Sequence, residues 1–409
     1  MTPPFAQVRE QVNLEQVNLK QSNLEQSNLE VGFDLPSGRL NLRVEPGSRD
    51  WFALLDLAVR QNPKRGFLFV SKVLGKHIPV SPRIVRETHV ALAVGLPKDL
   101  RENTLFIGLA ETATALGEGV FDAYRERSSI TNSSQDDLHF RHTTRYQIHG
   151  QTGDLIFQEP HSHATEHRLF GIRDLEAVRD VVLIDDEIST GTTLLNLSAA
   201  LKSELPSLER VVLVCLTDWS LGKNHDQSRF AELGLRVERT SLLHGAFDFQ
   251  SNPDWKISSV PNVLPNPHNA GETLPLRSAR TGAPGFDNNL LAEHVTRCVS
   301  SLPKNARVLV LGMGEYQYAP FLFARKLEEK RNDLEVKFSA TTRSPIESGL
   351  AITHKLEFID HCGDGIPNYV YNVDPKEFAA ILVCFEGDCQ PHESLLQALG
   401  AWAHALRLL

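Results

Sequence analysis

The sequence predicts an α/β fold in which helices flank a mostly parallel sheet, followed by a second α/β domain. Three observations lead to this prediction. Short apolar runs rich in Val, Ile and Leu alternate with helical segments along the chain. A chain of 409 residues is long enough for two domains. A stretch dense in Pro, Asn and Gly, residues 251–284, divides the alternating segments into two groups.

These patterns divide the chain into four parts. The predicted parts are a low-complexity leader (1–32), a first domain (33–250), a linker (251–284) and a second domain (285–409). The leader contains four tandem five-residue units between residues 11 and 30. Four such units are too few to bury a core by stacking. We therefore assign no function to the leader.

The composition limits the class of protein. A hydrophobic content of 41% allows a sizeable core, and a net charge of −9 argues against a surface that coats nucleic acid. The five cysteines include no Cys-x-x-Cys pair, which fits reduced thiols in a cytosol. No run approaches about eighteen apolar residues, and the amino terminus lacks the apolar core of a signal peptide. We expect a cytoplasmic protein that binds neither membranes nor nucleic acid.

The most informative stretch is residues 181–193, VVLIDDEISTGTT. Its apolar start predicts a short buried strand with Asp185 and Asp186 at the carboxyl end, followed by a hydroxyl-rich turn and a helix over 194–201. The amides of such a turn and the dipole of the helix favour a phosphate, while the two carboxylates can accept hydrogen bonds from neighbouring ribose hydroxyls. The predicted phosphate-binding residues are Ser189, Thr190, Gly191, Thr192 and Thr193.

All thirteen positions of this stretch resemble the phosphoribosyl-pyrophosphate (PRPP) motif of type I phosphoribosyltransferases. The alternative is an unrelated strand-loop-helix unit whose acidic pair holds Mg²⁺ in another phosphate enzyme. The resemblance implies the type I phosphoribosyltransferase fold and transfer of 5-phosphoribosyl from PRPP to an unidentified acceptor, with a ring nitrogen as nucleophile. Mg²⁺ would be bound mainly through PRPP oxygens. Asp185 and Asp186 would fix the ribose, and Glu187 would act as a base or orient the acceptor.

A second strand-loop-helix pattern occupies residues 104–119. Its small residues would let backbone amides approach an anion, as in the pyrophosphate loop of such enzymes. Arg145, or the polar loop from His161 to Arg168, would close over the leaving pyrophosphate. His161 and His163 could also be metal ligands, but no matching Cys or His cluster accompanies them. The predicted pyrophosphate-binding residues are Glu111, Thr112, Ala113 and Thr114.

Residues 66–82 combine an apolar, β-rich run with three basic side chains: Lys72, Lys76 and His77. In type I phosphoribosyltransferases the residues before the first core strand form a hood that holds the acceptor. The alternative is an amphipathic strand with solvated lysines. Trp219 follows a predicted strand at the edge where open α/β sheets bind ligands, so it either stacks on the acceptor or packs in the core.

The second domain repeats the first in outline. Residues 108–111 (GLAE) are echoed by residues 312–315 (GMGE), and residues 142–148 by residues 340–346. The later strand leads into residues 385–387 without an acidic pair or a hydroxyl loop. We interpret this domain as a degenerate copy that cannot bind PRPP in the usual way. Its candidate residues, which either line a second ligand site or only stabilise their turn, are Glu315 and Arg343.

The tetrapeptide Thr342-Arg343-Ser344-Pro345 makes the resemblance more specific. A phosphoribosyltransferase domain followed by this sequence is similar to two-domain proteins of bacterial tellurium-resistance-type gene clusters, whose second part is the TRSP domain. The resemblance covers about residues 36–409 and includes FVSKVLGKHIPV at 69–80. It implies a PRPP-dependent enzyme, possible as a homodimer, in a nucleoside-like biosynthetic or stress-response pathway.

A regulatory protein that senses PRPP or a nucleotide is the alternative function. A sensor needs only the phosphate loop and the carboxylates, whereas an enzyme also needs a pyrophosphate clamp and a closing loop. Because the sequence contains candidates for both additional features, we favour the enzyme.

Overall fold

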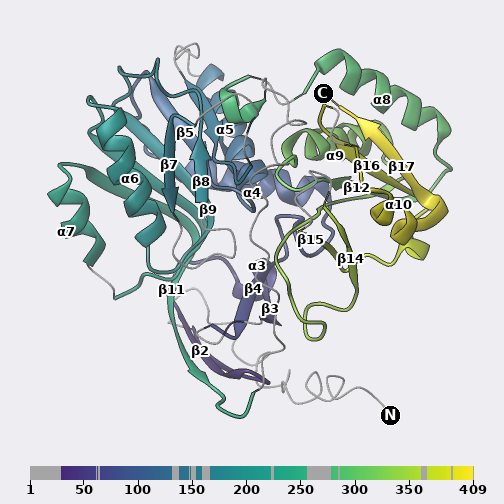
Figure 1. Cartoon of the computed structure of the whole chain (residues 1–409), viewed down its shortest axis with the longest axis horizontal. Helices are drawn as coiled ribbons and strands as arrows, with labels where there is room; N and C mark the ends of the chain where they lie inside the picture. The colour runs from purple at the N-terminus through teal and green to yellow at the C-terminus, as the bar shows by residue number, and fades with distance from the viewer. Residues whose placement is uncertain are drawn as a thin grey trace.

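A computed structural model of the chain describes residues 29–60, 62, 65–130, 138–146, 148, 153–158, 166–222, 225–255, 278–283, 286–360, 366–387 and 390–408. Two lobes lie side by side, each built on its own sheet (Figure 1). Residues 1–28, which hold nearly all of the pentapeptide units, lie outside the described residues. Within the described parts, no helix has the length and apolar character needed to cross a membrane.

The first lobe is built on a seven-stranded sheet in the order β1-β2-β11-β10-β9-β5-β6. Five of these strands run parallel and carry the candidate site. They are β5 (Thr104–Gly108), β6 (His139–His142), β9 (Asp180–Ile188), β10 (Arg210–Asp218) and β11 (Arg236–Ser251). Two antiparallel strands, β1 (Leu29–Leu35) and β2 (Gly38–Val44), extend the sheet beyond β11. Because β1 begins at Leu29, the last residues of the predicted leader belong to the sheet.

Helices cover both faces of this sheet. In β9, Val182 and Ile184 belong to the core beneath one pair of helices, and Val181 and Leu183 to the core on the opposite face. A strand that is buried on both faces has a continuous apolar sequence. This is why no polar side chain interrupts residues 181–184. The helices on the first face are α4 (Pro82–Gly95) and α5 (Thr114–Ile130), and those on the second are α6 (Thr192–Glu204) and α7 (His225–Glu232).

The second lobe contains a four-stranded parallel sheet in the order β13-β12-β16-β17. Its strands are β12 (Arg307–Gly312), β13 (Glu335–Ala340), β16 (Ala380–Phe385) and β17 (Ala403–Arg407). Helices α8 (Asn288–Ser301) and α9 (Tyr318–Lys330) cover one face, and α10 (Glu393–Leu399) covers the other. The predicted fold class, a mostly parallel α/β sheet with a second α/β region, is therefore confirmed.

Smaller elements surround the two sheets. The predicted hood segment, residues 66–82, begins with β4 (Phe67–Ser71), which pairs antiparallel with β3 (Leu55–Val59). A short helix, α3 (Trp51–Leu54), precedes β3. Two further antiparallel pairs follow β6 and β13 in the chain: β7 (Leu155–Gln158) with β8 (Glu166–Leu169), and β14 (Lys355–Ile359) with β15 (Pro367–Tyr371). The single-turn 3-10 helices are η2 (Ala279–Thr281), η3 (Pro375–Glu377) and η4 (Gly400–Trp402). His161 and His163 lie outside the described residues, and the end of the predicted polar loop is strand β8.

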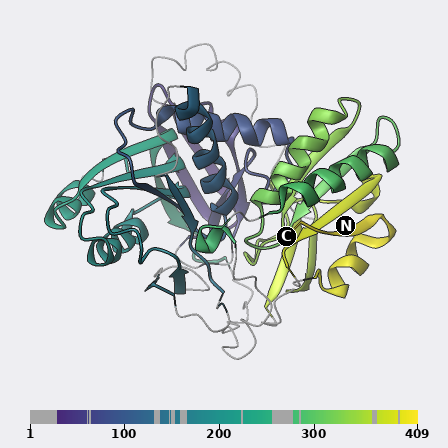
Figure 2. The same cartoon turned by 90° about the horizontal axis from the view of Figure 1, so that it is seen from above.

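The lobes share a buried interface. Helices α4 and α5 of the first lobe pack on α9 of the second (Figures 1 and 2). Val80 pairs with Phe338 in an isolated β-bridge, and both belong to one apolar cluster with residues of α9. The described end of the predicted linker also enters this interface, because Ser278 and Arg280 are almost fully buried. This segment therefore packs in the interface. The composition of residues 251–284, dense in Pro, Asn and Gly, had predicted a linker instead.

Candidate active site

The acidic pair lies inside strand β9, which continues to Ile188. Asp185 and Asp186 are half-buried, and the Asp185 carboxylate accepts a hydrogen bond of 2.9 Å from the Asp186 backbone N–H. Strands β5, β6 and β10 run parallel to β9 and end at the same edge of the sheet. Ligands of open α/β sheets bind at this carboxyl edge. Both carboxylates therefore lie where the sequence predicted a ribose.

The turn after β9 has the backbone form expected of an anion site. Gly191 has a φ of +70°, a left-handed conformation that glycine adopts without strain, and it caps the amino end of α6. Glycine has no side chain to cap the helix, and the Thr192 amide donates only a long hydrogen bond of 3.4 Å, to the Thr190 hydroxyl. Amides at such a helix start can bind an anion. The Thr190 hydroxyl donates to the Thr192 hydroxyl at 3.1 Å, which orders two of the predicted donors beside the turn.

Replacing Gly191 with alanine is expected to cost about 1–2 kcal/mol of stability, because a Cβ is strained at this φ. It should also weaken ribose 5-phosphate binding about tenfold, since the turn amides would move. Thermal unfolding and calorimetric titration would measure the two effects. Gly222→Ala is the matched control, because Gly222 has a φ of +77° in an exposed turn. Unchanged phosphate binding by Gly191→Ala would contradict the predicted phosphate site.

The predicted pyrophosphate loop joins β5 to α5. Leu109 N–H donates to the Ile184 carbonyl at 2.9 Å, which places the loop next to the acidic pair. Ala110 N–H donates to the Thr143 hydroxyl at 2.8 Å, which ties the loop to the end of β6. Helix α5 packs closely behind it, because a Cβ on Gly117 would lie 2.6 Å from the Cα of Gly108. The loop is thus held on three sides at the edge of the sheet.

Basic side chains converge on Glu111 in this loop. The Lys76 ammonium lies 2.5 Å from the Glu111 carboxylate, with only 2% of the lysine side chain exposed. It also donates to the Thr341 carbonyl of the second lobe at 2.8 Å. Burial pushes the pKa of Glu111 up, but Lys76, Arg343 and Arg145 together lower it below its usual value. Glu111 is therefore ionised among three cations, an arrangement suited to a further anion.

The other predicted hood residues have structural contacts. The Lys72 ammonium donates to the Phe52 carbonyl at 2.8 Å. His77 is buried, and burial followed by the nearby Lys76 charge lowers its pKa to about 3. Trp219 is fully buried and stacks on Phe69 with ring centroids 4.6 Å apart. Of the two alternatives for Trp219, the structure supports packing in the core.

Glu187 has a partner that the sequence did not predict. Both carboxylate oxygens of Glu187 accept from one nitrogen of Arg65, at 2.7 and 2.9 Å. The Arg65 guanidinium lies 4.8 Å from the centre of the Phe67 ring, which holds it against the hood strand. Burial raises the pKa of Glu187, and the Arg65 charge opposes this only in part. The ion pair fixes the Glu187 carboxylate between the acidic pair and the hood.

Arg145 follows β6 and reaches the pyrophosphate loop, where its guanidinium donates to the Ala110 carbonyl at 3.4 Å. Its backbone N–H and the Thr144 hydroxyl both donate to Glu315 of the second lobe, at 2.8 and 2.6 Å. Glu315, which was predicted for a separate second site, therefore contacts Arg145, which was predicted for the first site.

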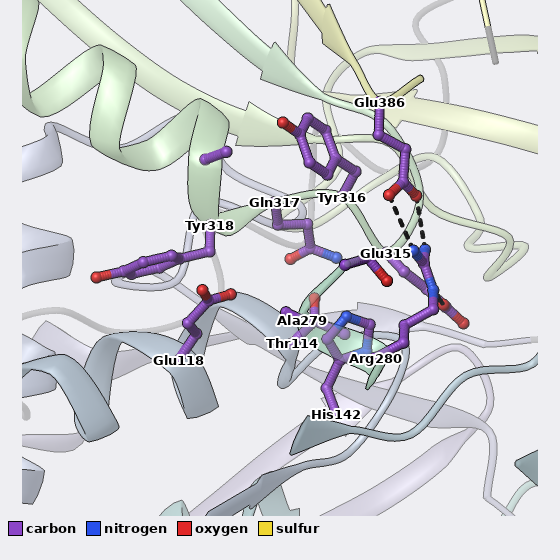
Figure 3. Close-up of a pocket in the computed structure, with 12 residues that line it drawn as sticks. Thr114, Glu118, His142, Ala279, Arg280, Glu315, Tyr316, Gln317, Tyr318 and Glu386 are labelled. Atoms are coloured by element: carbon purple, nitrogen blue, oxygen red, sulfur yellow. Dashed lines mark hydrogen bonds and ion pairs between the residues drawn. The ribbon is translucent and has the colours of Figure 1, made fainter. Parts of the chain in front are cut away.

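Glu315 also lines a small cavity between the lobes (Figure 3). There Arg280 binds both oxygens of Glu386, at 2.9 and 2.7 Å, and lies 3.2 Å from Glu315. Arg343 does not belong to this lining; its guanidinium lies 4.3 Å from the centre of the Tyr146 ring. The two predicted second-site residues therefore have different surroundings. Arg280 was missed because it lies in a stretch with the composition of a linker.

Glu118 of α5 faces the same cavity (Figure 3). Burial and the neighbouring Asp122 charge raise its pKa from 4.5 to about 8. The folded state then keeps a proton that the unfolded state loses, so Glu118 should reduce stability progressively between pH 4.5 and about 8. We expect Glu118→Gln to flatten this part of the stability curve and to be more stable than the parent at pH 8 in thermal unfolding. The exposed Glu293→Gln is the control and should change neither; parallel curves for parent and Glu118→Gln would contradict the prediction.

Comparison with known proteins covers both lobes. Residues 54–246 match the family model described as phosphoribosyl transferase, and residues 277–399 match the model described as the TRSP domain that is C-terminal to it. A search of curated proteins gives no match.

Solved structures similar to the chain include three phosphoribosyltransferases. The adenine enzyme of Trypanosoma brucei, in complex with AMP, pyrophosphate and ribose-5-phosphate, is 17% identical over 39% of this chain and 64% of its own, with a TM-score of 0.26. The adenine enzyme of Thermoanaerobacter pseudethanolicus is 14% identical over 46% and 95%, with a TM-score of 0.29. The orotate enzyme of Aeropyrum pernix is 17% identical over 44% and 78%, with a TM-score of 0.25. The chain thus spans just under two thirds of the trypanosomal enzyme.

Proposed function

We propose that this chain, which belongs to the phosphoribosyl transferase family and carries a C-terminal TRSP domain, moves 5-phosphoribosyl from Mg²⁺-PRPP to a nitrogen of a small acceptor and releases pyrophosphate. The observation that carries the proposal is the geometry of β9 and its turn. Asp185 and Asp186 lie at the carboxyl edge of the parallel strands, and the left-handed Gly191 follows them at the start of a helix.

In the proposed reaction, the bond from the anomeric carbon to pyrophosphate breaks and both electrons leave with pyrophosphate. The acceptor nitrogen attacks the same carbon from the opposite face, with inversion, and its surplus proton passes to Glu187 or to water. Positive charge develops on the ribose in the transition state, so the protein acts mainly through orientation and electrostatics. Residues 189–193 would hold the 5′-phosphate, while Asp185 and Asp186 would accept hydrogen bonds from the ribose hydroxyls.

The leaving pyrophosphate would lie against residues 111–114. Negative charge grows on this group as the bond breaks, and fixed cations beside it lower the barrier. Lys76 and Arg145 support this assignment, since both act on Glu111 in the loop. Glu187, fixed by Arg65, would face the acceptor from the hood side.

Mg²⁺ would enter with PRPP. This ion binds carboxylate and phosphate oxygens and usually keeps several waters. The half-buried carboxylates of Asp185 and Asp186 fit such contacts, with most ligands supplied by PRPP itself. The ion would neutralise charge on the pyrophosphate.

The product would be a nucleotide-like molecule of a biosynthetic or stress-response pathway in the cytoplasm. The buried free thiols of Cys215, Cys298 and Cys384 are consistent with that compartment.

The test is pyrophosphate release from Mg²⁺-PRPP in the presence of a panel of purines, pyrimidines and other nitrogen heterocycles. Release that depends on one acceptor would support the transferase. Binding of PRPP without release for any acceptor would favour the alternative, a PRPP-sensing regulatory protein. Failure to bind PRPP would overturn both.

A further inference from the structure

The second lobe repeats the first residue by residue around one loop. In the first lobe, Gly108 at the end of β5 pairs with His142, and in the second lobe Gly312 at the end of β12 pairs with Ala340. The strand orders β6-β5-β9-β10 and β13-β12-β16-β17 also correspond. Counting from these pairs, the equivalent positions are Glu111 with Glu315, and Arg145 with Arg343.

The loop after the glycine makes the same hydrogen bonds in both lobes. In the first lobe, Thr143 N–H donates to the Gly108 carbonyl at 2.9 Å, and Ala110 N–H donates to the Thr143 hydroxyl at 2.8 Å. The equivalent bonds of the second lobe join Thr341 N–H to the Gly312 carbonyl at 2.9 Å and Gly314 N–H to the Thr341 hydroxyl at 2.7 Å. The correspondence therefore extends to individual atoms.

In the second lobe, a protein side chain lies between the equivalent carboxylates. Gly108 pairs with Ile184 and Gly312 with Cys384, so Glu386 has the position that Asp186 has in the first lobe. The guanidinium of Arg280 bridges Glu386 and Glu315 (Figure 3). One guanidinium of the chain thus pairs with both acidic positions of the second lobe.

The two repeated loops meet each other at the interface. From the second lobe, Glu315 receives hydrogen bonds from Thr144 and the backbone of Arg145. Gln317 donates to the Glu111 carbonyl at 3.0 Å, so the second lobe contacts the pyrophosphate loop directly. Arg343 lies over Tyr146, the residue that follows Arg145. The Arg145 turn therefore lies against the loop of the second lobe, and Arg343 lies against the Arg145 turn.

The charges at this meeting point favour an added anion. Lys76, Arg145 and Arg343 all act on Glu111, and the Arg343 guanidinium lies 3.9 Å from the Asp360 carboxylate. Only 2% of the Lys76 side chain, 10% of the Arg343 side chain and 12% of the Glu111 side chain are exposed. An anion placed among these cations would accept charge-assisted hydrogen bonds where little water competes.

We propose that the TRSP domain completes the pyrophosphate site of the transferase domain. Arg343 binds the leaving pyrophosphate from across the interface, and Glu315 is a positioning residue that holds the Arg145 turn. This inference rests on the proposed function, because it assigns a role in that same site. In this proposal, one pyrophosphate site contains Glu111, Arg145 and Arg343.

The test uses calorimetric titration of the full chain with Mg²⁺-pyrophosphate and, separately, with ribose 5-phosphate. Arg343→Ala is expected to weaken pyrophosphate binding about 10- to 100-fold, the worth of one or two charge-assisted hydrogen bonds, and to leave ribose 5-phosphate binding unchanged. Arg343→Lys should retain part of the affinity. The control Arg297→Ala removes an exposed arginine of the same domain and should change neither ligand.

Pyrophosphate binding by Arg343→Ala within about twofold of the parent would overturn the inference. An equal loss for both ligands would also overturn it, since that would indicate a purely structural role. If the parent chain binds neither ligand, the proposed function itself fails. If the parent binds ribose 5-phosphate but not pyrophosphate, only the inference fails.

Glu315 is tested by two substitutions with the same ligands. One oxygen of Glu315 accepts from the Thr144 hydroxyl and the other from the Arg145 backbone N–H, so Glu315→Gln keeps one of the two acceptors, whereas Glu315→Ala removes both. We expect Glu315→Ala to weaken pyrophosphate binding about tenfold without affecting ribose 5-phosphate, and Glu315→Gln to retain part of the lost affinity. Equal affinities for Glu315→Ala and the parent would overturn the positioning role.

Discussion

Changing Asp185 and Asp186 together to asparagine is expected to abolish measurable binding of Mg²⁺-PRPP and of ribose 5-phosphate. Each carboxylate is proposed to accept charge-assisted hydrogen bonds from the ribose, worth about 1.5–3 kcal/mol apiece. Losing both should therefore weaken binding about 100-fold to 10,000-fold. Asparagine has nearly the same shape, so the half-buried strand end should keep its packing. Isothermal titration calorimetry of parent and variant would measure the loss.

A matched control removes the same two charges elsewhere. Asp248 lies exposed on β11 and Asp254 lies exposed just after it, so Asp248→Asn with Asp254→Asn gives an equal change in net charge. This control should bind both ligands as the parent does. Retained binding in the Asp185/Asp186 variant, or an equal loss in the control, would contradict the assignment of the ribose to these carboxylates.

Residues 181–193 were predictable because the pattern is local. An apolar strand, two acids, a glycine turn and a helix all lie within a short segment, and each follows from short-range sequence preferences. The strand limits were less predictable. Strand β9 continues through the acids because its pairing with β10 extends to Ile188 opposite Asp218. Strand β11 extends to Ser251 because its second half pairs with β2, a partner from the opposite end of the domain.

The charged partners of the site could not be predicted, because they join distant parts of the chain. Arg65 and Glu187 are 122 positions apart, and Arg280 and Glu386 are 106 apart. No periodicity connects such residues, and a basic side chain in a polar segment is usually solvated. For Trp219 a distant partner was also missed. Its position just after a strand end allowed a contact with the acceptor, but the sequence did not reveal that Phe69 stacks on its ring.

The repeat was partly visible in the sequence. The similarity of GLAE to GMGE and the Thr-Thr-Arg sequence shared by both domains predict how the two domains align. The strand pairing has the same alignment. The sequence did not reveal that Arg280 lies between Glu315 and Glu386. A missing acidic pair suggested a lost site, whereas the structure shows an internal ion cluster at the corresponding positions. A degenerate copy can therefore keep charged residues for contact between domains.

Replacing Arg280 with methionine is expected to destabilise the chain by about 3–5 kcal/mol, the usual effect of breaking a buried ion pair on one side. Only 2% of the Arg280 side chain is exposed, as are 1% of Glu315 and 3% of Glu386, so water cannot replace the lost guanidinium. Methionine keeps much of the volume of the arginine stem, which isolates the effect of charge. Chemical denaturation at pH 7 would measure the change in the free energy of unfolding.

The pH dependence distinguishes lost charge from lost packing. Burial pushes the pKa of Glu315 up, but Arg280 and the hydrogen bond from Thr144 hold it below its usual value. Its ionised form therefore stabilises the parent above the ordinary glutamate pKa of 4.5, and this contribution falls as the pH drops through the folded value. Without Arg280 the ionised carboxylate is a cost, so the deficit of Arg280→Met should be largest near pH 7 and shrink towards about pH 4.

Two comparisons complete this experiment. Arg297→Met changes an exposed arginine of the same domain and should leave stability nearly unchanged. Adding Glu315→Gln and Glu386→Gln to Arg280→Met removes the unpaired charges and should recover part of the lost stability at pH 7. A deficit that stays constant with pH, with no recovery in the triple variant, would show that Arg280 stabilises the interface by packing and not by charge.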